Sequence, residues 1–193
     1  GTGTDFACFP PGMDITAIDL SDEMLRRAAR RCGQYPGNLR LVKADAQSLP
    51  FPETSFDTVA TSCTMCSLHD PARSLREIHR VLRPHGKVFL TTHGIWKEHA
   101  EPFDRWRFTP DGLRAVFKPF AAQPCITPQG GSWLALLQLF NLWVSAWRRP
   151  GFVPRKLWFW ARAPLYVLPN LLGLLDRGGN TRLVQNYLVV AEK

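Results

Sequence analysis

An acidic residue at the end of a short apolar segment is the first candidate for ligand binding. Gly1-Thr2-Gly3 precedes the segment Asp14-Ile-Thr-Ala-Ile-Asp19, which is apolar between its two acids. In doubly wound sheets, a glycine turn lets the backbone approach a ligand, and a carboxylate after the next strand accepts hydrogen bonds from ribose hydroxyls. This arrangement predicts that Asp19 holds the ribose of a nucleotide-like ligand.

Histidines and cysteines are the candidates for proton transfer and metal binding. His69, His93 and His99 could each act as a general base, because histidine titrates near neutrality, or could be ordinary loop residues. His93 is the best placed in the sequence, just past an expected strand. Cys63 and Cys66 have CxxC spacing, but a four-ligand zinc site needs a second pair, which the chain lacks. No metal site is therefore predicted.

A short charged and aromatic segment, 104–107, follows the expected strand 87–92. Arg107 could bind a carboxylate or phosphate through two hydrogen bonds, and Trp106 could stack on a flat acceptor or sugar. Equally, the segment could be a loop held by its own aromatic contacts and ion pairs. Trp106 and Arg107 are thus candidate substrate-binding residues.

Composition excludes several classes of protein. The 193 residues are 45% apolar and 21% charged, which indicates a globular domain that is not disordered. Five cysteines, an odd number, do not suggest a secreted disulfide framework. Residues 133–182 contribute six of the eight net positive charges. Charge concentrated there favours an anionic surface or substrate, and nucleic-acid binding is not expected.

Apolar segments with strand patterns alternate with helical patterns along the chain. Expected strands are 15–18, 39–42, 56–62, 87–92, 122–127 and 184–191. Expected helices are 4–9, 21–32, 70–82 and 109–117, with a turn at 83–86. This alternation predicts a parallel α/β sheet with right-handed crossovers.

Residues 130–182 interrupt that pattern with a long aromatic and basic stretch, which holds five of the seven tryptophans. Residues 133–147 are nearly all apolar but too few to span a bilayer, which needs roughly 20 residues. Residues 157–175 contain Arg162, Pro164 and Pro169. The stretch leaves a strand at its carboxyl end and is expected to rise over the ligand-binding face. Its composition is typical of an element at a membrane interface. The alternative is a lid or dimer face packed on the core.

Five segments in order resemble a known family. Residues 1–92 resemble a class I S-adenosylmethionine-dependent methyltransferase of the small-molecule group, type 11 or UbiE-like. The matching segments are Gly1–Gly3, Ala17–Leu25, Ala44–Pro52, Ser55–Val59 and Leu75–Gly86. His85 stands where the family usually has glycine after proline, which is expected to change only a turn. The resemblance implies a Rossmann-like, doubly wound, mostly parallel sheet, with a helical aromatic insert before the last strand.

The resemblance also implies positions for the cofactor, S-adenosyl-L-methionine, at the carboxyl ends of the strands. The implied cofactor-binding residues are Gly1 and Gly3 at the methionine part, Asp19 at the ribose, Leu20 near the adenine, Asp45 and Ala46 at the adenine edge, and Ser62 and Cys63 on the sulfonium and acceptor side. The implied division is a core at 1–129, an insert at 130–182 and the last core strand at 183–193. The core is expected to lack the family's first strand, which normally lies in the middle of the sheet.

The expected function is methyl transfer to a small, partly apolar or lipid- or envelope-related acceptor. Residues 101–113 resemble a segment of bacterial methyltransferases associated with envelope polysaccharide and glycolipid metabolism. The expected location is cytoplasmic, with peripheral contact at the inner face of the membrane. One alternative is a non-catalytic methyltransferase-like binding protein that acts at a membrane surface through the insert. Another is a nicotinamide-dependent oxidoreductase, which the segments Asp45-Ala46 and Leu49-Pro50-Phe51 disfavour.

Overall fold

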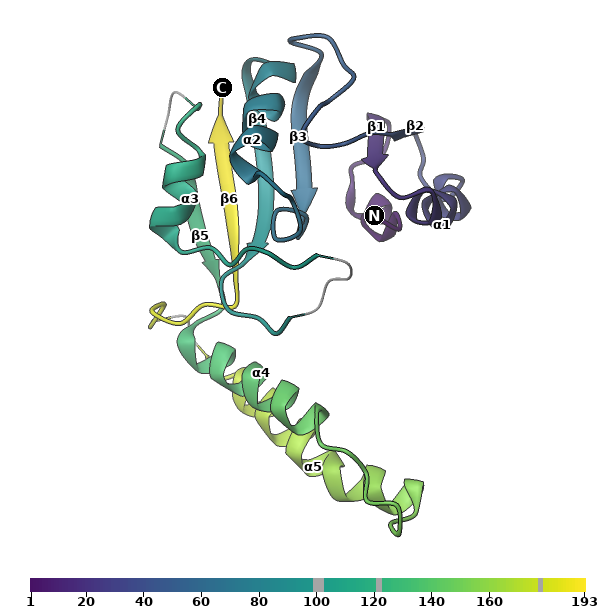
Figure 1. Cartoon of the computed structure of the whole chain (residues 1–193), viewed down its shortest axis with the longest axis vertical. Helices are drawn as coiled ribbons and strands as arrows, with labels where there is room; N and C mark the ends of the chain where they lie inside the picture. The colour runs from purple at the N-terminus through teal and green to yellow at the C-terminus, as the bar shows by residue number, and fades with distance from the viewer. Residues whose placement is uncertain (99–102, 121–122, 177–178) are drawn as a thin grey trace.

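Strands and helices alternate in the computed structural model, which describes residues 1–98, 103–120, 123–176 and 179–193 (Figure 1). The first half contains the 3-10 helix η1 (Thr4–Cys8), β1 (Asp14–Asp19), α1 (Asp22–Cys32), β2 (Asn38–Lys43), β3 (Phe56–Ser62) and α2 (Pro71–Val81). The second half contains β4 (Leu82–His93), α3 (Pro110–Val116), β5 (Cys125–Gln129), α4 (Ser132–Ser145), α5 (Arg155–Gly173) and β6 (Asn186–Glu192). His99, Glu101, Pro102 and Ala122, which belong to predicted features, lie outside the described residues.

Side-chain caps fix where three of the helices begin. Ser21, Asp70 and Thr109 stand just before α1, α2 and α3. Each side-chain oxygen accepts a hydrogen bond from the backbone N–H three residues later, at 3.4, 2.9 and 3.1 Å respectively. Such caps satisfy backbone donors that a helix leaves unpaired at its start. The three starts predicted from the sequence are therefore confirmed.

The strands form two sheets, and only β6 runs against the other strands of its sheet, so the arrangement is mostly parallel, as predicted. β1 pairs with β2 in parallel, and the second sheet has the order β3-β4-β6-β5. β3 and β4 are parallel, whereas β6 runs antiparallel to both of its neighbours. Figure 1 shows β1 and β3 with their arrowheads directed towards the same end of the molecule. The carboxyl ends of the parallel strands thus share one side, where ligands bind in open α/β sheets.

Each sheet has its own hydrophobic core. Phe6, Ala28 and Tyr35 form the small core beside β1 and β2. The larger core lies around β4 and β6 and includes Leu75 and Val88, both fully buried. β1 and β3 belong to different sheets, so each is paired through one edge only. Unpaired strand edges leave backbone donors and acceptors in need of partners.

The turn predicted at 83–86 is wrong in part. These residues belong to β4, but the pairing with β3 passes from Phe56↔Leu82 to Thr58↔Lys87, so they form a bulge. His85 within it has a φ of 62°. The bulge pairs with the end of the chain, since the Lys193 N–H donates to the Gly86 carbonyl at 3.0 Å. This contact spans the length of the chain, so local sequence does not reveal it.

Helices α4 and α5 form a hairpin between β5 and β6, within the stretch predicted to be a helical insert. They pack against each other, and Figure 1 shows the hairpin extending away from the sheet. It starts at the carboxyl end of β5, the side predicted, but it projects outwards and does not cover that end. Neither core contains a residue of α4 or α5. Within the described residues, the helices do not combine the length and apolarity required to cross a bilayer.

The split sheet predicts uneven amide exchange. In β1 and β3, alternate N–H groups point to the unpaired edge, so they should exchange on the order of a hundredfold or more faster than those of β4 and β6, which have neighbours on both sides. Residue-resolved hydrogen exchange by NMR, corrected for intrinsic rates, would measure this. Equally slow exchange in all four strands would show that the two sheets are joined in solution.

Candidate functional site

The glycine turn at the start of the chain requires glycine at position 3. Gly3 has a φ of 74°, in the left-handed region that side chains disfavour. A Cβ atom there would lie 2.5 Å from the Phe6 ring. The turn is tied to α1, because Arg31 Nη1 donates to the Thr2 carbonyl at 2.7 Å. Position 3 therefore requires glycine, and the turn is fixed in place by its contact with α1.

Asp19 ends β1 beside this turn, so the structure brings together the residue predicted to hold the ribose and the turn predicted to lie at the methionine part of the cofactor. Its Oδ1 accepts from the Ser21 N–H at 2.8 Å, and its Oδ2 pairs with the α-amino group of Gly1. The carboxylate remains partly exposed, at 21%. Leu20 next to it is 65% exposed, which leaves an apolar side chain open to solvent at the strand end. A flat apolar group could pack there.

Asp45 lies at the carboxyl end of the neighbouring strand. The Ala44 N–H donates to the Asp19 carbonyl at 3.2 Å, which joins the ends of β1 and β2. Asp45 Oδ1 accepts from the backbone and the side chain of Gln47, at 2.8 and 3.2 Å. Gln47 Oε1 in turn accepts from the Asp70 N–H at 2.7 Å. Gln47 thus connects the Asp45 carboxylate to the start of α2.

Gln47 is a residue that sequence reasoning missed. An amide two residues after an aspartate is ordinary in a loop, and its hydrogen bond to Asp70 crosses 23 positions. The sequence signal was weak: Gln47 lies inside the segment Ala44–Pro52 that matched the family, but nothing there indicates its partner. Only the fold places it between the Asp45 carboxylate and the Asp70 backbone N–H.

Ser62 and Cys63 stand at the carboxyl end of β3. Cys63 has a φ of 50°, and its N–H donates to the Thr91 carbonyl at 2.9 Å, which holds it beside β4. A non-glycine residue in the left-handed region is strained, and such strain is concentrated at functional sites. Cys66 Sγ donates to the Cys63 carbonyl at 3.2 Å, and burial raises the pKa of the Cys66 thiol. Cys66 is therefore a neutral thiol that shapes the turn.

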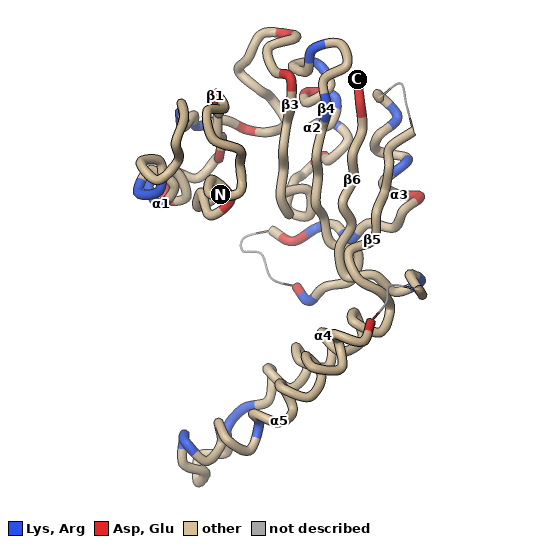
Figure 2. The backbone as a smooth tube through the Cα atoms, turned by 180° about the vertical axis from the view of Figure 1, so that it is seen from behind, with Lys and Arg blue, Asp and Glu red and all other residues tan. Residues whose placement is uncertain are grey.

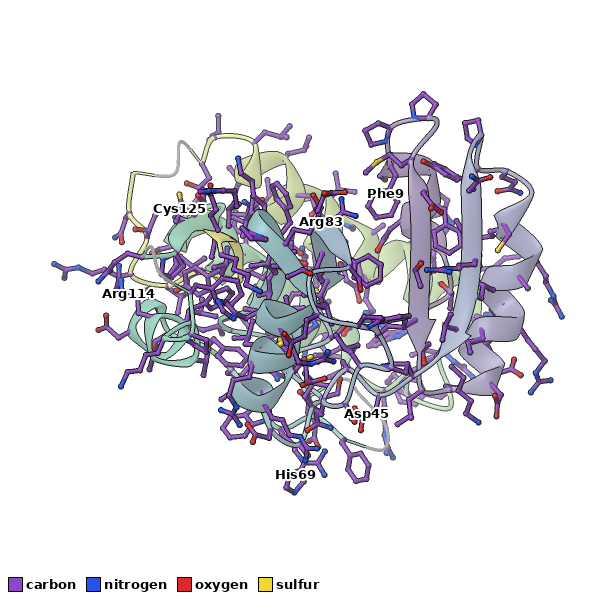
Figure 3. All side chains as sticks on the ribbon, turned by 90° about the horizontal axis from the view of Figure 1, so that it is seen from above. Phe9, Asp45, His69, Arg83, Arg114 and Cys125 are labelled. Carbon is purple, nitrogen blue, oxygen red and sulfur yellow. The ribbon has the colours of Figure 1, made fainter. Side chains whose placement is uncertain are left out.

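An open pocket of about 540 Å³ lies between the start of α2 and the 106–109 segment. It unites three residues predicted for the acceptor side: His69, Trp106 and Arg107 all line it. His69 is exposed, and Figure 3 shows it on the same side of the molecule as Asp45. The Trp106 Nε1–H donates to the Leu68 carbonyl at 2.8 Å, while 40% of this residue stays exposed. The indole is thus fixed and still accessible for stacking.

Arg107 uses all five of its N–H donors within the chain. Its Nη1 and Nη2 atoms bind the two Asp104 oxygens at 2.5 and 2.7 Å, and the remaining donors reach the carbonyls of Trp96, Lys97 and Trp106. The Asp104 side chain is 1% exposed, and its hydrogen bonds raise the pKa of Arg107. An acceptor carboxylate would have to displace some of these bonds. The predicted role of Arg107 in binding an acceptor stays a prediction.

The second predicted base, His93, is separate from the pocket. Its side chain is buried, its Nδ1 lies 2.6 Å from Asn186 Oδ1, and its ring stacks on Trp96 with centroids 5.9 Å apart. With the amide oxygen as acceptor, Nδ1 carries the proton. His93 reaches the pocket wall through its backbone, because its carbonyl accepts from the Phe108 N–H at 3.0 Å. The two predicted bases therefore occupy different environments.

These residues fit the cofactor that the resemblance implies. Ribose hydroxyls and an adenine amino group are hydrogen-bond donors, and Asp19 and Asp45 offer acceptor-only carboxylates at neighbouring strand ends. Gly3 adds no side chain of its own to the turn, although the Phe6 ring fills the place of a Cβ there, and exposed Leu20 offers apolar surface for the adenine. Among the described residues, no group of three or more His, Cys, Asp or Glu side chains could hold a metal ion.

Comparisons with known proteins point the same way. Residues 1–90 match the profile of the family described as "Methyltransferase domain". Thiol S-methyltransferase TMT1B of Homo sapiens is 33% identical over 125 residues, which cover 62% of this chain and 47% of that protein. The ubiquinone/menaquinone biosynthesis C-methyltransferase UbiE of Pasteurella multocida is 35% identical over 96 residues, which cover 47% of this chain and 36% of that protein. The chain thus spans less than half the length of these two relatives.

Solved structures share the fold. An S-adenosylmethionine-dependent methyltransferase from Mesorhizobium loti aligns with a TM-score of 0.54 and 19% identity, over 93% of this chain and 80% of that one. A second, from Methanosarcina mazei, aligns with a TM-score of 0.57 and 18% identity, over 94% of this chain and 82% of that one. Likeness at this identity establishes the Rossmann-like fold class.

Gly3→Ala should destabilise the glycine turn by roughly 1–3 kcal/mol, because a Cβ is strained at this φ and meets the Phe6 ring. Thermal unfolding followed by circular dichroism would measure the change. Gly33→Ala is the matched control, since Gly33 has a φ of −66° and no atom within 4 Å of the new Cβ. Equal effects of the two substitutions would contradict the special requirement at position 3.

Proposed function

We propose that this chain, whose residues 1–90 match the methyltransferase-domain family, transfers a methyl group from S-adenosyl-L-methionine to a small, partly apolar acceptor. The observation that carries the proposal is the pair of carboxylates, Asp19 and Asp45, at the adjacent carboxyl ends of two parallel strands. Open α/β sheets bind nucleotide ligands at this edge, and the acids match the donors of a ribose and an adenine.

The bound cofactor supplies an activated methyl group on a sulfonium, so the chain needs mainly to align the acceptor with it. Asp19 and Asp45 bind and orient the nucleoside part. Gln47 holds Asp45 in place and links it to Asp70, which lines the acceptor-side pocket. Ser62 and Cys63, at the end of β3, lie on the predicted sulfonium and acceptor side.

The pocket lined by His69 and Trp106 is the proposed acceptor site. Trp106 offers a fixed, exposed ring for stacking on a flat or apolar group, and His69 can take a proton from an acceptor oxygen, nitrogen or sulfur. Relatives of the chain are named for thiol S-methylation and for C-methylation in quinone biosynthesis. Small thiols and quinols are therefore the acceptor classes to test first.

A lipid- or envelope-related acceptor is the narrower form of the proposal. The α4–α5 hairpin supports it, because its exposed aromatic residues begin at the carboxyl end of β5, on the side of the molecule where β1 and β3 also end. The alternative is a non-catalytic binding protein that acts at a membrane surface through the hairpin. The exposed aromatic residues of the hairpin fit this alternative as well. Cofactor titration separates the two.

Asp19→Asn should weaken S-adenosylmethionine binding by roughly 1–3 kcal/mol, because ribose hydroxyls lose a charged acceptor. Isothermal titration calorimetry measures the affinity. Asp14→Asn is the control, since Asp14 is exposed at the opposite end of the same strand. Unchanged affinity in Asp19→Asn would remove Asp19 from the site, and a parent chain that does not bind the cofactor would favour the non-catalytic alternative.

His69→Ala should lower the rate of methyl transfer by about 10²–10⁴-fold if His69 is the general base, and cofactor affinity should not change. Formation of S-adenosylhomocysteine with an alkyl thiol and with a quinol as acceptors would report the rate. His93→Gln tests the second candidate in the same assay. A loss of less than about tenfold in His69→Ala would remove His69 as the base, and equally small losses in both variants would assign the rate to acceptor alignment.

A further inference from the structure

The α4–α5 hairpin exposes large apolar side chains along one stripe of each helix. In α4 these residues recur every three or four positions: Trp133, Leu136, Phe140, Trp143 and Trp147, the last just past the helix end. In α5 the stripe contains Leu157, Trp160, Val167, Leu168 and Leu171, and Leu174 and Leu175 continue it. This regular spacing places each set along one side of its helix.

Polar side chains lie between the two helices, and α4 also buries the apolar residues Ala135, Leu137 and Val144. Gln138 Nε2 donates to Asn170 Oδ1 at 3.4 Å, and Arg162 Nη2 donates to the Val144 carbonyl and to the Tyr166 hydroxyl. Asn141 is 9% exposed, and its Oδ1 finds no hydrogen-bond partner within the described part of the chain. In water, surface helices bury apolar residues and expose polar ones. The hairpin departs from this pattern on its outer sides, where the apolar stripes are exposed, while some polar groups lie between the helices. Exposed apolar stripes are the arrangement that lipid favours.

The hairpin is also electrostatically one-sided. Arg148, Arg149, Arg155 and Lys156 cluster around its outer turn, where all four are exposed (Figure 2). Asp176, which is the only acid in residues 133–182, lies at the opposite end. Its Oδ2 accepts from the N–H groups of Gly131 and Leu134, at 2.9 and 2.8 Å. The outer turn therefore has positive charge that no acid of the hairpin balances.

We infer that the α4–α5 hairpin docks the protein on an anionic lipid surface, where its helices lie along the interface. Apolar stripes enter the acyl boundary, and the four cations contact anionic headgroups. The hairpin is not expected to enter the bilayer with its outer turn leading. The 14 residues of α4 span about 21 Å, which is shorter than the ~30 Å hydrocarbon core, so the four cations of the turn would remain inside that core. If a second copy of the chain covered the apolar stripes instead of lipid, the four cations of one hairpin would repel the four cations of the other. The inference does not depend on methyl transfer.

Vesicle flotation tests the inference. The 193-residue chain should float with phosphatidylglycerol–phosphatidylcholine vesicles at low salt, and much less with phosphatidylcholine alone. Changing Arg148, Arg149, Arg155 and Lys156 to Gln should weaken partitioning about fivefold for each charge at the surface. The matched control changes Arg26, Arg30, Arg73 and Lys118, all exposed on the core, to Gln. The control removes the same net charge and should float nearly as the parent does.

The apolar stripes are tested separately. Leu168→Gln with Leu171→Gln should reduce flotation at least tenfold, and Met13→Gln with Phe103→Gln, two exposed apolar residues of the core, should not. Quenching of tryptophan fluorescence by brominated acyl chains should occur in the parent and decrease in the Leu168/Leu171 variant. Circular dichroism confirms that each variant keeps the helical content of the parent.

Several outcomes would overturn the inference. These are no flotation of a folded parent chain, equal flotation with neutral vesicles, or equal losses in the hairpin variants and their matched controls. Sedimentation velocity tests whether the stripes bind a second copy of the chain. If the parent forms a dimer and does not float, and the Leu168/Leu171 variant is monomeric, a second copy covers the stripes. S-adenosylmethionine titration of the same samples is independent, so a chain that floats without binding the cofactor contradicts only the proposed function.

Discussion

Parallel pairing is the constraint on which the rest of the structure depends. Parallel strands all end at the same edge of a sheet, so β1, β2, β3 and β4 deliver their terminal residues to one side of the molecule. Asp19, Asp45 and Cys63 therefore face the same end, although long segments of sequence separate them. The same pairing limits the fold, because β1 and β3 each keep one unpaired edge. A strand parallel to both would satisfy these edges, which is the position where the resemblance puts the family's first strand.

The sequence predicted the elements well because their signals are local. Capping residues and apolar periodicity placed the helices that begin after Ser21, Asp70 and Thr109, and the strands that end near Asp19 and Ser62. Misjudged features depend on distant partners. The bulge at 83–86 pairs with Lys193, and β5 begins at Cys125 because its register is set by β6. Local patterns do not contain such information.

In the candidate site, too, local sequence predicted some residues and missed those whose roles depend on distant partners. The family segments located Asp19 and Asp45, and chain order alone put Trp106 and His69 on the ligand side. Sequence reasoning favoured His93 over His69, and it did not show that His93 is buried against Asn186 while His69 lines the pocket. Nor did it show that Arg107 is saturated by Asp104 and three carbonyls, or that Gln47 bridges Asp45 and Asp70. Burial and long-range hydrogen bonds decide these roles, and both are properties of the folded chain.

The ends of the hairpin have a further consequence. Gln129, the last residue of β5, is directly paired with Asn186, the first of β6, so the 56 positions between them begin and end at neighbouring points of one antiparallel ladder. An antiparallel pair can be closed by a turn of two residues. The sheet therefore does not need the hairpin for its topology. Such a segment can be gained, lost or exchanged during evolution without a change of strand order, and it can be transplanted as a unit to another protein with the same final ladder.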